Sequence, residues 1–208
     1  MEITILTILA IVSACLQVLA EYRGPKVQIY ICKPLTMVFI LGIALLGGDS
    51  EPLYKYLIIT GLLFSLAGDI FLMLPDDRFI SGLVSFLIAH LFYIWAFGLN
   101  LSGYIWWPLM LLGVYGIMIY FFLAPSLSKL KIPVIVYISA ILCMVWLAWE
   151  GYVQHSSEKA SLAIIGAGLF AVSDSALAIN RFRKPFAQSR AVIMFTYFAA
   201  QWCIASSI

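Results

Sequence analysis

Two aspartates of this 208-residue chain lie deep inside long apolar segments, where an ionisable side chain is costly to bury. Asp69 follows Gly68 near the end of the segment Leu53–Leu74, and Asp174 has a similar position in Ser161–Ile179. Apolar surroundings favour the protonated form of a carboxyl group, which can then serve as a general acid. The alternative is that each aspartate pairs with a neighbouring cation and only holds helices together.

Other polar side chains lie on single faces of two further apolar segments. His90 and Tyr93 are three residues apart, a spacing that puts both on one helix face. A short turn joins their segment to that of Asp69, so we expect them to reach its level. His90 is a candidate base or a structural hydrogen-bonding group. Tyr197 and Gln201 also share a face, which makes them candidates for substrate contact or for internal packing.

Charged residues near the segment ends are candidates for contacting the polar part of a substrate. Lys33 lies near the start of the second apolar segment. A basic cluster follows the segment of the second aspartate: Arg181, Arg183 and Lys184. Basic residues at this level can meet a lipid phosphate, or they can simply determine orientation. Glu150 ends the sixth segment, far from the aspartates, as a substrate contact or as a solvated helix end.

The remaining residues exclude several kinds of site. The four cysteines form no C-x-x-C pair and lie at no metal-ligand spacing (Cys15, Cys32, Cys143 and Cys203). Their positions within or beside apolar segments are typical of cysteines that pack as small hydrophobic residues between helices. The chain has no Gly-rich phosphate loop, no nucleophile elbow and no nucleic-acid-binding patch. We therefore expect no metal, no cofactor and no nucleic-acid partner.

The elements that carry these residues are predicted to be membrane-spanning helices. Hydrophobic residues make up 64% of the chain and charged residues 11%, against roughly 45–50% apolar and about 25% charged in soluble domains. A spanning helix needs about 20 mostly apolar residues. Eight segments reach or approach this length: Ile3–Ala20, Ile29–Leu46, Leu53–Leu74, Phe79–Leu99, Tyr104–Leu123, Ile132–Trp149, Ser161–Ile179 and Ala191–Ile208. The sequence predicts an all-α, polytopic bundle of eight transmembrane helices in one domain, residues 1–208.

Helix breakers fill the short connections: Gly24-Pro25, Gly48-Asp49, Pro75-Asp76-Asp77, Ser102-Gly103 and Pro125-Ser126. Asp76 and Asp77 are candidates to cap the fourth helix. Because Lys33-Pro34 interrupts the second segment, that helix starts either before or at Lys33. The first segment lacks a basic region ahead of it, so we expect a retained span rather than a cleaved signal.

The basic residues predict the orientation. Ten of the twelve Lys and Arg fall in the first, third, fifth and seventh connections: Arg23, Lys26, Lys33, Arg78, Lys129, Lys131, Arg181, Arg183, Lys184 and Arg190. The other side holds Lys55 and Lys159. Because basic residues are enriched in cytoplasmic loops, both termini are expected outside the cytoplasm. We expect an integral membrane protein of a bacterial inner membrane, surrounded by membrane lipids.

A weak internal repeat relates the two halves. Asp69 and Asp174 are 105 residues apart, as are Gly61 and Gly166, and the third and seventh helices run in the same direction. A parallel four-plus-four repeat is one interpretation, and chance matching between Gly-rich apolar helices is the other.

Several short motifs, in one order over nearly the whole chain, resemble the YhhN-like family, whose animal members are lysoplasmalogenases. They are Tyr22-Arg23-Gly24-Pro25, Lys33-Pro34, Gly68-Asp69, Ala89-His90-Leu91-x-Tyr93, Trp146-Leu147-Ala148-Trp149-Glu150 and Ser173-Asp174. The resemblance implies hydrolysis of the vinyl-ether bond of a lysophospholipid, a lysoplasmalogen. The products are a fatty aldehyde and glycerophosphoethanolamine or glycerophosphocholine.

The chemistry of that reaction matches the residues found. A vinyl ether is cleaved by protonating its β-carbon, which creates an oxocarbenium ion that water traps. Asp69 is the first candidate for the acid, and Asp174 can stabilise the cation or activate water, as paired carboxylates do in glycoside hydrolysis. His90 is an alternative base. We expect Asp69, His90, Tyr93 and Asp174 to line one cavity open toward the cytoplasmic leaflet, with Lys33 and the cluster at Arg181 facing the phosphate.

Two other functions remain open from the residues alone. A four-plus-four bundle with intramembrane aspartate and histidine is also consistent with a proton-coupled transporter of small molecules or lipids. A lipid-binding protein without catalytic activity is the third possibility.

Overall fold

A computed structural model describes residues 1–48, 51–74, 76 and 78–208. Every regular element in this part of the chain is helical, which confirms the all-α prediction. The eight α-helices of the described residues are α1 (Glu2–Arg23), α2 (Lys26–Leu46), α3 (Pro52–Met73), α4 (Phe79–Gly98), α5 (Trp107–Leu123), α6 (Lys131–His155), α7 (Glu158–Phe182) and α8 (Ser189–Ser206). Two short 3₁₀ helices, Ala124–Ser126 and Ser128–Leu130, join α5 to α6.

Seven of the eight described helices, α1 to α7, are long and apolar enough to cross a membrane when α5 is taken together with the 3₁₀ turn Ala124–Ser126. The remaining helix, α8, is 18 residues long and packs against α1, α2, α3 and α7. The polar residues Tyr197 and Gln201 contribute to the lower hydropathy of α8. Both are buried within the bundle, so they are not exposed to lipid. The protein is an integral membrane protein.

Most helix boundaries differ from the predicted segments by one to three residues, and the differences in α2, α5 and α6 affect the interpretation. The helix α2 begins at Lys26, so a start at Lys33 is wrong, and Pro34 lies inside the helix. The helix α5 begins at Trp107 rather than at Tyr104. Pro108 near its start fits this boundary, because proline is tolerated in the first helical turn.

The end of α6 is the largest correction to the predicted boundaries. The helix continues to His155, so Glu150 does not end it as predicted. Glu150 has no exposed surface, because the connection between α4 and α5 covers it and supplies a hydrogen bond. The prediction that Glu150 forms a solvated helix end is therefore wrong, because its carboxylate is buried.

The predicted turn and cap residues before α4 are described only in part. Arg78 precedes the first turn of α4 and makes no side-chain cap. Asp76 lies 3.8 Å from the guanidinium of Arg78, measured from Oδ2 to Nη2. The predicted turn or cap residues Asp49, Pro75 and Asp77 lie outside the described residues.

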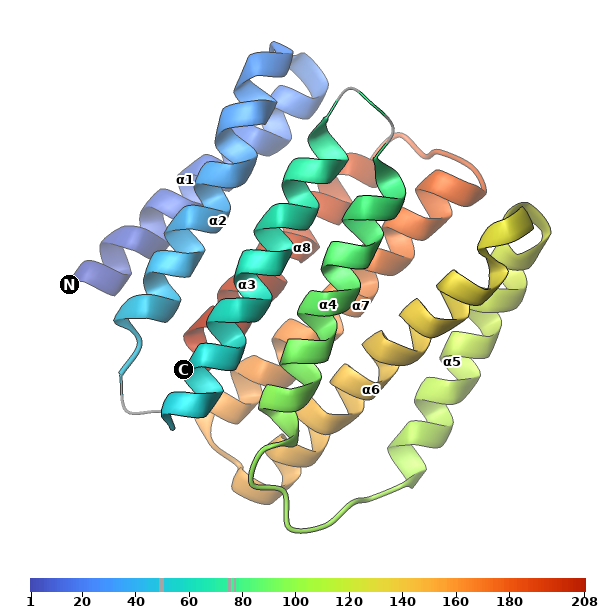
Figure 1. Cartoon of the computed structure of the whole chain (residues 1–208). Coiled ribbons are helices and arrows are strands. Elements are labelled where there is room, and N and C mark those ends of the chain that lie inside the picture. Colours follow the sequence, from blue (N-terminus) through green and yellow to red (C-terminus); the bar gives the residue numbers. More distant parts are fainter. Residues whose placement is uncertain (49–50, 75, 77) are drawn as a thin grey trace.

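Sequential hairpins build the bundle, and the hairpins α3–α4 and α7–α8 are packed to a similar extent. The pairs α1–α2, α3–α4 and α7–α8 are the most extensively packed neighbours, and α4–α6 and α2–α8 join them across the bundle (Figure 1). Glycines allow the close approach in two of these pairs. Gly61 of α3 faces the ring of Tyr93, and Gly166 of α7 faces Ile204 and the backbone of Ala200. Equivalent glycines at equivalent helix pairs support the four-plus-four interpretation.

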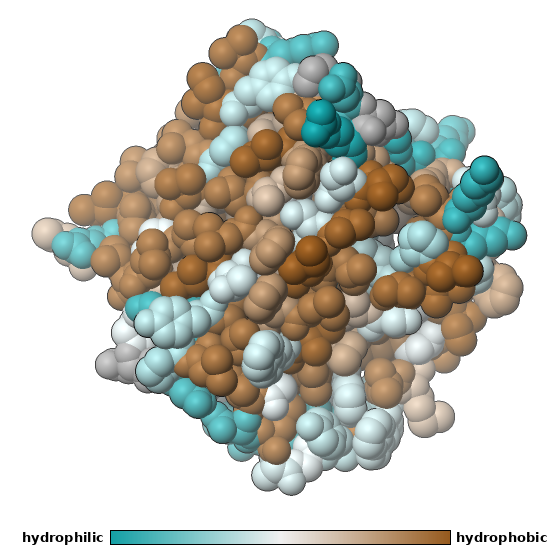
Figure 2. Space-filling model, in the orientation of Figure 1, coloured by the Kyte–Doolittle hydropathy of each residue, from teal (hydrophilic) through white to brown (hydrophobic). Residues whose placement is uncertain are grey.

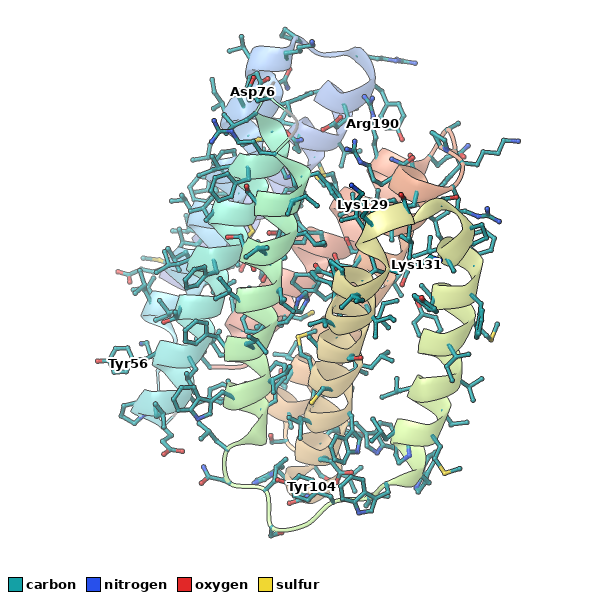
Figure 3. The ribbon with its side chains drawn as sticks, turned by 45° about the vertical axis from the view of Figure 1, so that its right-hand side comes forward. Tyr56, Asp76, Tyr104, Lys129, Lys131 and Arg190 are labelled. Atoms are coloured by element: carbon teal, nitrogen blue, oxygen red, sulfur yellow. The ribbon has the colours of Figure 1, made fainter. Side chains whose placement is uncertain are left out.

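The surface has the distribution expected of a membrane protein. Apolar side chains cover much of the visible face, and hydrophilic residues gather mainly toward its ends (Figure 2). Lys129, Lys131 and Arg190 lie at one end of the bundle, and Tyr104 lies at the other (Figure 3). We call the first of these the basic end, because the helix termini that meet there carry most of the Lys and Arg residues.

Candidate active site

The first buried cluster surrounds Asp69 on α3. Its Oδ1 lies 3.0 Å from Nζ of Lys33 on α2. Its Oδ2 accepts a hydrogen bond of 2.6 Å from the phenol of Tyr197 on α8. Asp69 is only 1% exposed and Lys33 only 5%. Both carboxylate oxygens are therefore engaged, and a buried cation balances the charge.

The second cluster surrounds Asp174 on α7. Its Oδ2 accepts a hydrogen bond of 2.7 Å from the phenol of Tyr137 on α6. The same oxygen lies 3.7 Å from Nε2 of His90 on α4. Within the described part of the chain, Oδ1 accepts no hydrogen bond and no Lys or Arg pairs with this carboxylate. One carboxylate oxygen of Asp174, Oδ1, is therefore uncommitted: it has no hydrogen-bond or ion-pair partner among the described residues. Both carboxylate oxygens of Asp69 have partners.

The helices that supply the two clusters correspond when each helix number is shifted by four. Asp69 on α3 receives one group from α2 and one from α8, and Asp174 on α7 receives one from α6 and one from α4. Each carboxylate thus meets one tyrosine hydroxyl and one nitrogen-bearing side chain. The nitrogen differs: it is a lysine ammonium at Asp69 and an imidazole at Asp174.

Phe170 lies between the two clusters. Its ring is 4.6 Å from that of His90 and 5.6 Å from that of Tyr197, measured between centroids. These two neighbours belong to different clusters, and Phe170 has no exposed surface. An aromatic side chain, rather than an open cavity, therefore fills the space between His90 and Tyr197.

A third group of buried polar side chains lies in the core. The phenol of Tyr93 donates a hydrogen bond of 2.9 Å to Oε1 of Gln201 and lies 3.5 Å from Oγ of Ser65. Gln201 has no exposed surface, and its Nε2 has no hydrogen-bond partner among the described residues. Tyr93 and Gln201 are thus brought together by α4 and α8, within the core.

A narrow crevice of about 50 Å³ reaches Asp174. Asp174, Tyr137 and Ser175 provide its polar lining. The rest of the lining is apolar: Phe79, Leu83, Ile119, Leu123, Val134, Ile138, Ile141, Leu177, Ala178 and Phe182. Asp69, His90 and Tyr93 are not among the residues that line this crevice. Of the four residues expected to share a cavity, Asp174 is the one that borders it.

A guanidinium lies near one part of the crevice lining. Phe79 begins α4 and Phe182 ends α7, so both place this lining at the basic end. The guanidinium of Arg181 lies over the Phe79 ring, 4.8 Å from its centroid. Arg183 makes a similar contact with Phe122, also at 4.8 Å. Positive charge and apolar surface thus adjoin each other near Asp174.

Glu150 has a structural environment near the other end of the bundle. Its Oε1 accepts a hydrogen bond of 2.8 Å from the backbone N–H of Ile105. The indole of Trp146 donates a hydrogen bond of 3.0 Å to the carbonyl of Ile105. These contacts fasten the connection before α5 to α6. The predicted role of Glu150 in substrate binding has no support from these contacts.

Tyr137 is the residue that sequence reasoning missed. Tyrosines near segment ends are typical of membrane interfaces, and this one lies in the sixth predicted segment between apolar residues. Its position five residues inside that segment, beyond the first helical turn, was the signal that could have identified it. Among the described residues, no group of three or more His, Cys, Asp or Glu side chains is arranged to hold a metal ion.

The family model that matches the chain is the YhhN family, over residues 28–208. The chain belongs to the YhhN family. It is 32% identical to the uncharacterized membrane protein YhhN of Escherichia coli O157:H7, over 94% of each chain. No solved structure matches it.

Two animal relatives have names that state an activity. The chain is 39% identical to lysoplasmalogenase TMEM86A of Bos taurus, over 72% of this chain and 64% of the relative. It is 33% identical to lysoplasmalogenase TMEM86B of Sus scrofa, over 85% of this chain and 73% of the relative. These names give no support to the transporter alternative.

Proposed function

We propose that this YhhN-family protein is a lysoplasmalogenase-like hydrolase that cleaves the vinyl-ether bond of a lysophospholipid. The names of the animal relatives support a hydrolase acting on a lipid. The structural observation that carries the proposal is the uncommitted oxygen of Asp174 beside an apolar crevice. A carboxyl group in that position can contact the hydrocarbon that adjoins a vinyl-ether bond.

In this mechanism Asp174 is the general acid. Its proton moves to the β-carbon of the vinyl ether, where the electron pair of the C=C bond forms the new C–H bond. The resulting oxocarbenium ion is balanced by the carboxylate of Asp174. Water then adds to the α-carbon and loses a proton to that carboxylate or to His90. The hemiacetal so formed breaks its C–O bond, giving a fatty aldehyde and the glycerol hydroxyl.

The basic end supplies a place for the phosphate. Arg181 is seven residues beyond Asp174 on the same helix, a separation of about 10 Å along the axis at the usual helical rise. A glycerophosphate linker and an arginine side chain together can bridge that length. The apolar lining is suited to the hydrocarbon adjoining the ether bond. Arg181 contacts Phe79, a ring of this lining, whereas Lys33 lies in the other cluster, so Arg181 has the better position for phosphate contact.

Aldehyde release tests the proposal. Purified protein is incubated with 1-alkenyl lysophosphatidylethanolamine, and fatty aldehyde is measured by mass spectrometry. The 1-alkyl analogue, which lacks the double bond that accepts the proton, is the matched control and should give no aldehyde. Asp174→Asn keeps the size of the side chain but removes the acid, so kcat should fall by about 10²–10⁴-fold. Absence of aldehyde with the folded wild-type protein would overturn the proposal.

A further inference from the structure

Tyr137 touches both the carboxyl group of Asp174 and the crevice. Its phenol donates to Oδ2 of Asp174 at 2.7 Å, and the residue is part of the crevice lining. Its ring meets that of His90 edge to face, with centroids 5.3 Å apart and an interplanar angle of 89°. Tyr137 is 8% exposed. Packing against His90 therefore restrains the phenol where it contacts the carboxyl group.

We propose that Tyr137 is a positioning residue of the hydrolase, acting through Asp174; this inference rests on the proposed function. A protonated carboxyl group has one hydroxyl oxygen and one carbonyl oxygen. Because Tyr137 donates to Oδ2, that oxygen acts as the acceptor and the proton is carried by Oδ1. The oxygen without a protein partner among the described residues is then the one that donates to substrate.

The same hydrogen bond assists the transfer itself. When the proton leaves, Asp174 becomes a carboxylate, and a hydrogen bond to a charged acceptor is stronger than one to a neutral acceptor. Tyr137 consequently stabilises the state after transfer more than the state before it. Interactions that strengthen toward the transition state increase kcat rather than substrate affinity.

The comparison with Asp69 indicates why one carboxylate is available and the other is not. Tyr197 donates to Asp69 much as Tyr137 donates to Asp174, but Lys33 occupies the remaining oxygen of Asp69. The corresponding oxygen of Asp174 has no such cation among the described residues. The two tyrosines thus form similar contacts, and Tyr137 is the one beside the crevice.

The test compares Tyr137→Phe with the wild type in the aldehyde assay. Loss of one charge-assisted hydrogen bond should reduce kcat by about 10–100-fold, with KM within about threefold because the substrate contacts remain. Tyr54→Phe is the matched control: it removes a phenol hydrogen bond to Ser207, near the opposite end of the bundle. Its kcat should stay within about twofold, since Tyr54 lines neither the crevice nor the Asp174 cluster.

A double variant separates positioning from a general structural role. If Tyr137 acts through Asp174, Asp174→Asn with Tyr137→Phe should be no slower than Asp174→Asn alone. If the fold-decreases in kcat of the two single variants multiply in the double variant, the two residues act independently, and the inference is overturned. Incorporating 3-fluorotyrosine at position 137 provides a variant that retains the ring and the donor if Tyr137→Phe fails to fold. An altered kcat at unchanged melting temperature is expected, and an unchanged kcat would contradict the inference.

The outcomes also separate the inference from the proposed function. Aldehyde formation by the wild type with equal kcat for Tyr137→Phe would overturn the role of Tyr137 and leave the hydrolase intact. No aldehyde from the wild type would overturn the hydrolase itself.

Discussion

Lys33 and Asp69 form an ion pair with almost no exposed surface, 3.0 Å from Nζ to Oδ1. The pair joins α2 to α3. Lys33 thus engages Oδ1 of Asp69, whereas Oδ1 of Asp174 has no partner among the described residues. Two aspartates that lie 105 residues apart, on α3 and α7, therefore have different environments. This difference is the reason for assigning the acid to Asp174 in the proposed mechanism.

Breaking the Lys33–Asp69 pair should destabilise the protein more than removing both partners. Asp69→Asn leaves a buried ammonium without its counter-ion, at a cost of about 3–5 kcal/mol. Combining it with Lys33→Met should recover much of that loss. Thermal unfolding in detergent measures both variants. A well-folded Asp69→Asn protein whose turnover falls by about 10²–10⁴-fold would instead identify Asp69 as the acid.

Arg181→Gln should weaken binding of the lysolipid phosphate. We expect KM to rise about tenfold, the loss typical of one charge-assisted contact, with kcat changed less. Arg78→Gln is the control, because Arg78 is an exposed cation of the basic end that pairs with Asp76. Steady-state kinetics of both variants in mixed micelles provide the comparison. Equal KM values would remove Arg181 from phosphate recognition.

The orientation of the bundle can be tested with reporters. Lys33 is buried inside α2, and nine of the other eleven Lys and Arg lie in or beside the odd-numbered connections. A reporter fused after Ile208 should therefore lie outside the cytoplasm. A second reporter in the connection between α5 and α6 should be cytoplasmic. Cytoplasmic activity of the first reporter would show an inverted protein or an odd number of spans.

Gly61→Ala should destabilise the α3–α4 pair. A Cβ at this position would overlap the ring of Tyr93, which has no exposed surface and little freedom to move. Overpacking of this kind costs about 1–3 kcal/mol. Gly113→Ala on α5 is the control, because a Cβ there meets no atom within 4 Å. Melting temperatures that fall equally for both variants would contradict the packing explanation.

The membrane class, the helical fold and the approximate spans could be predicted from the amino-acid sequence. These properties follow from local composition, since a run of about 20 apolar residues is stable in lipid only as a helix or within a barrel. The same reasoning singled out Asp69, Asp174 and His90, because polar groups in such runs are conspicuous. It could not place Glu150, whose burial depends on a backbone N–H from a connection 45 residues away.

The packing of the helices determines which aspartate is paired with a cation and which one borders the crevice. Lys33 and Tyr197 reach Asp69 from α2 and α8, and Tyr137 and His90 reach Asp174 from α6 and α4. Contacts between residues so distant in the chain depend on the rotation and packing of several helices. The hydrophobic pattern of the sequence is a weak guide to helix rotation and packing, because the lipid-facing and core-facing surfaces of a helix are both apolar. Helix packing therefore determines that Oδ1 of Asp69 is paired with Lys33, and that Oδ1 of Asp174 has no partner among the described residues.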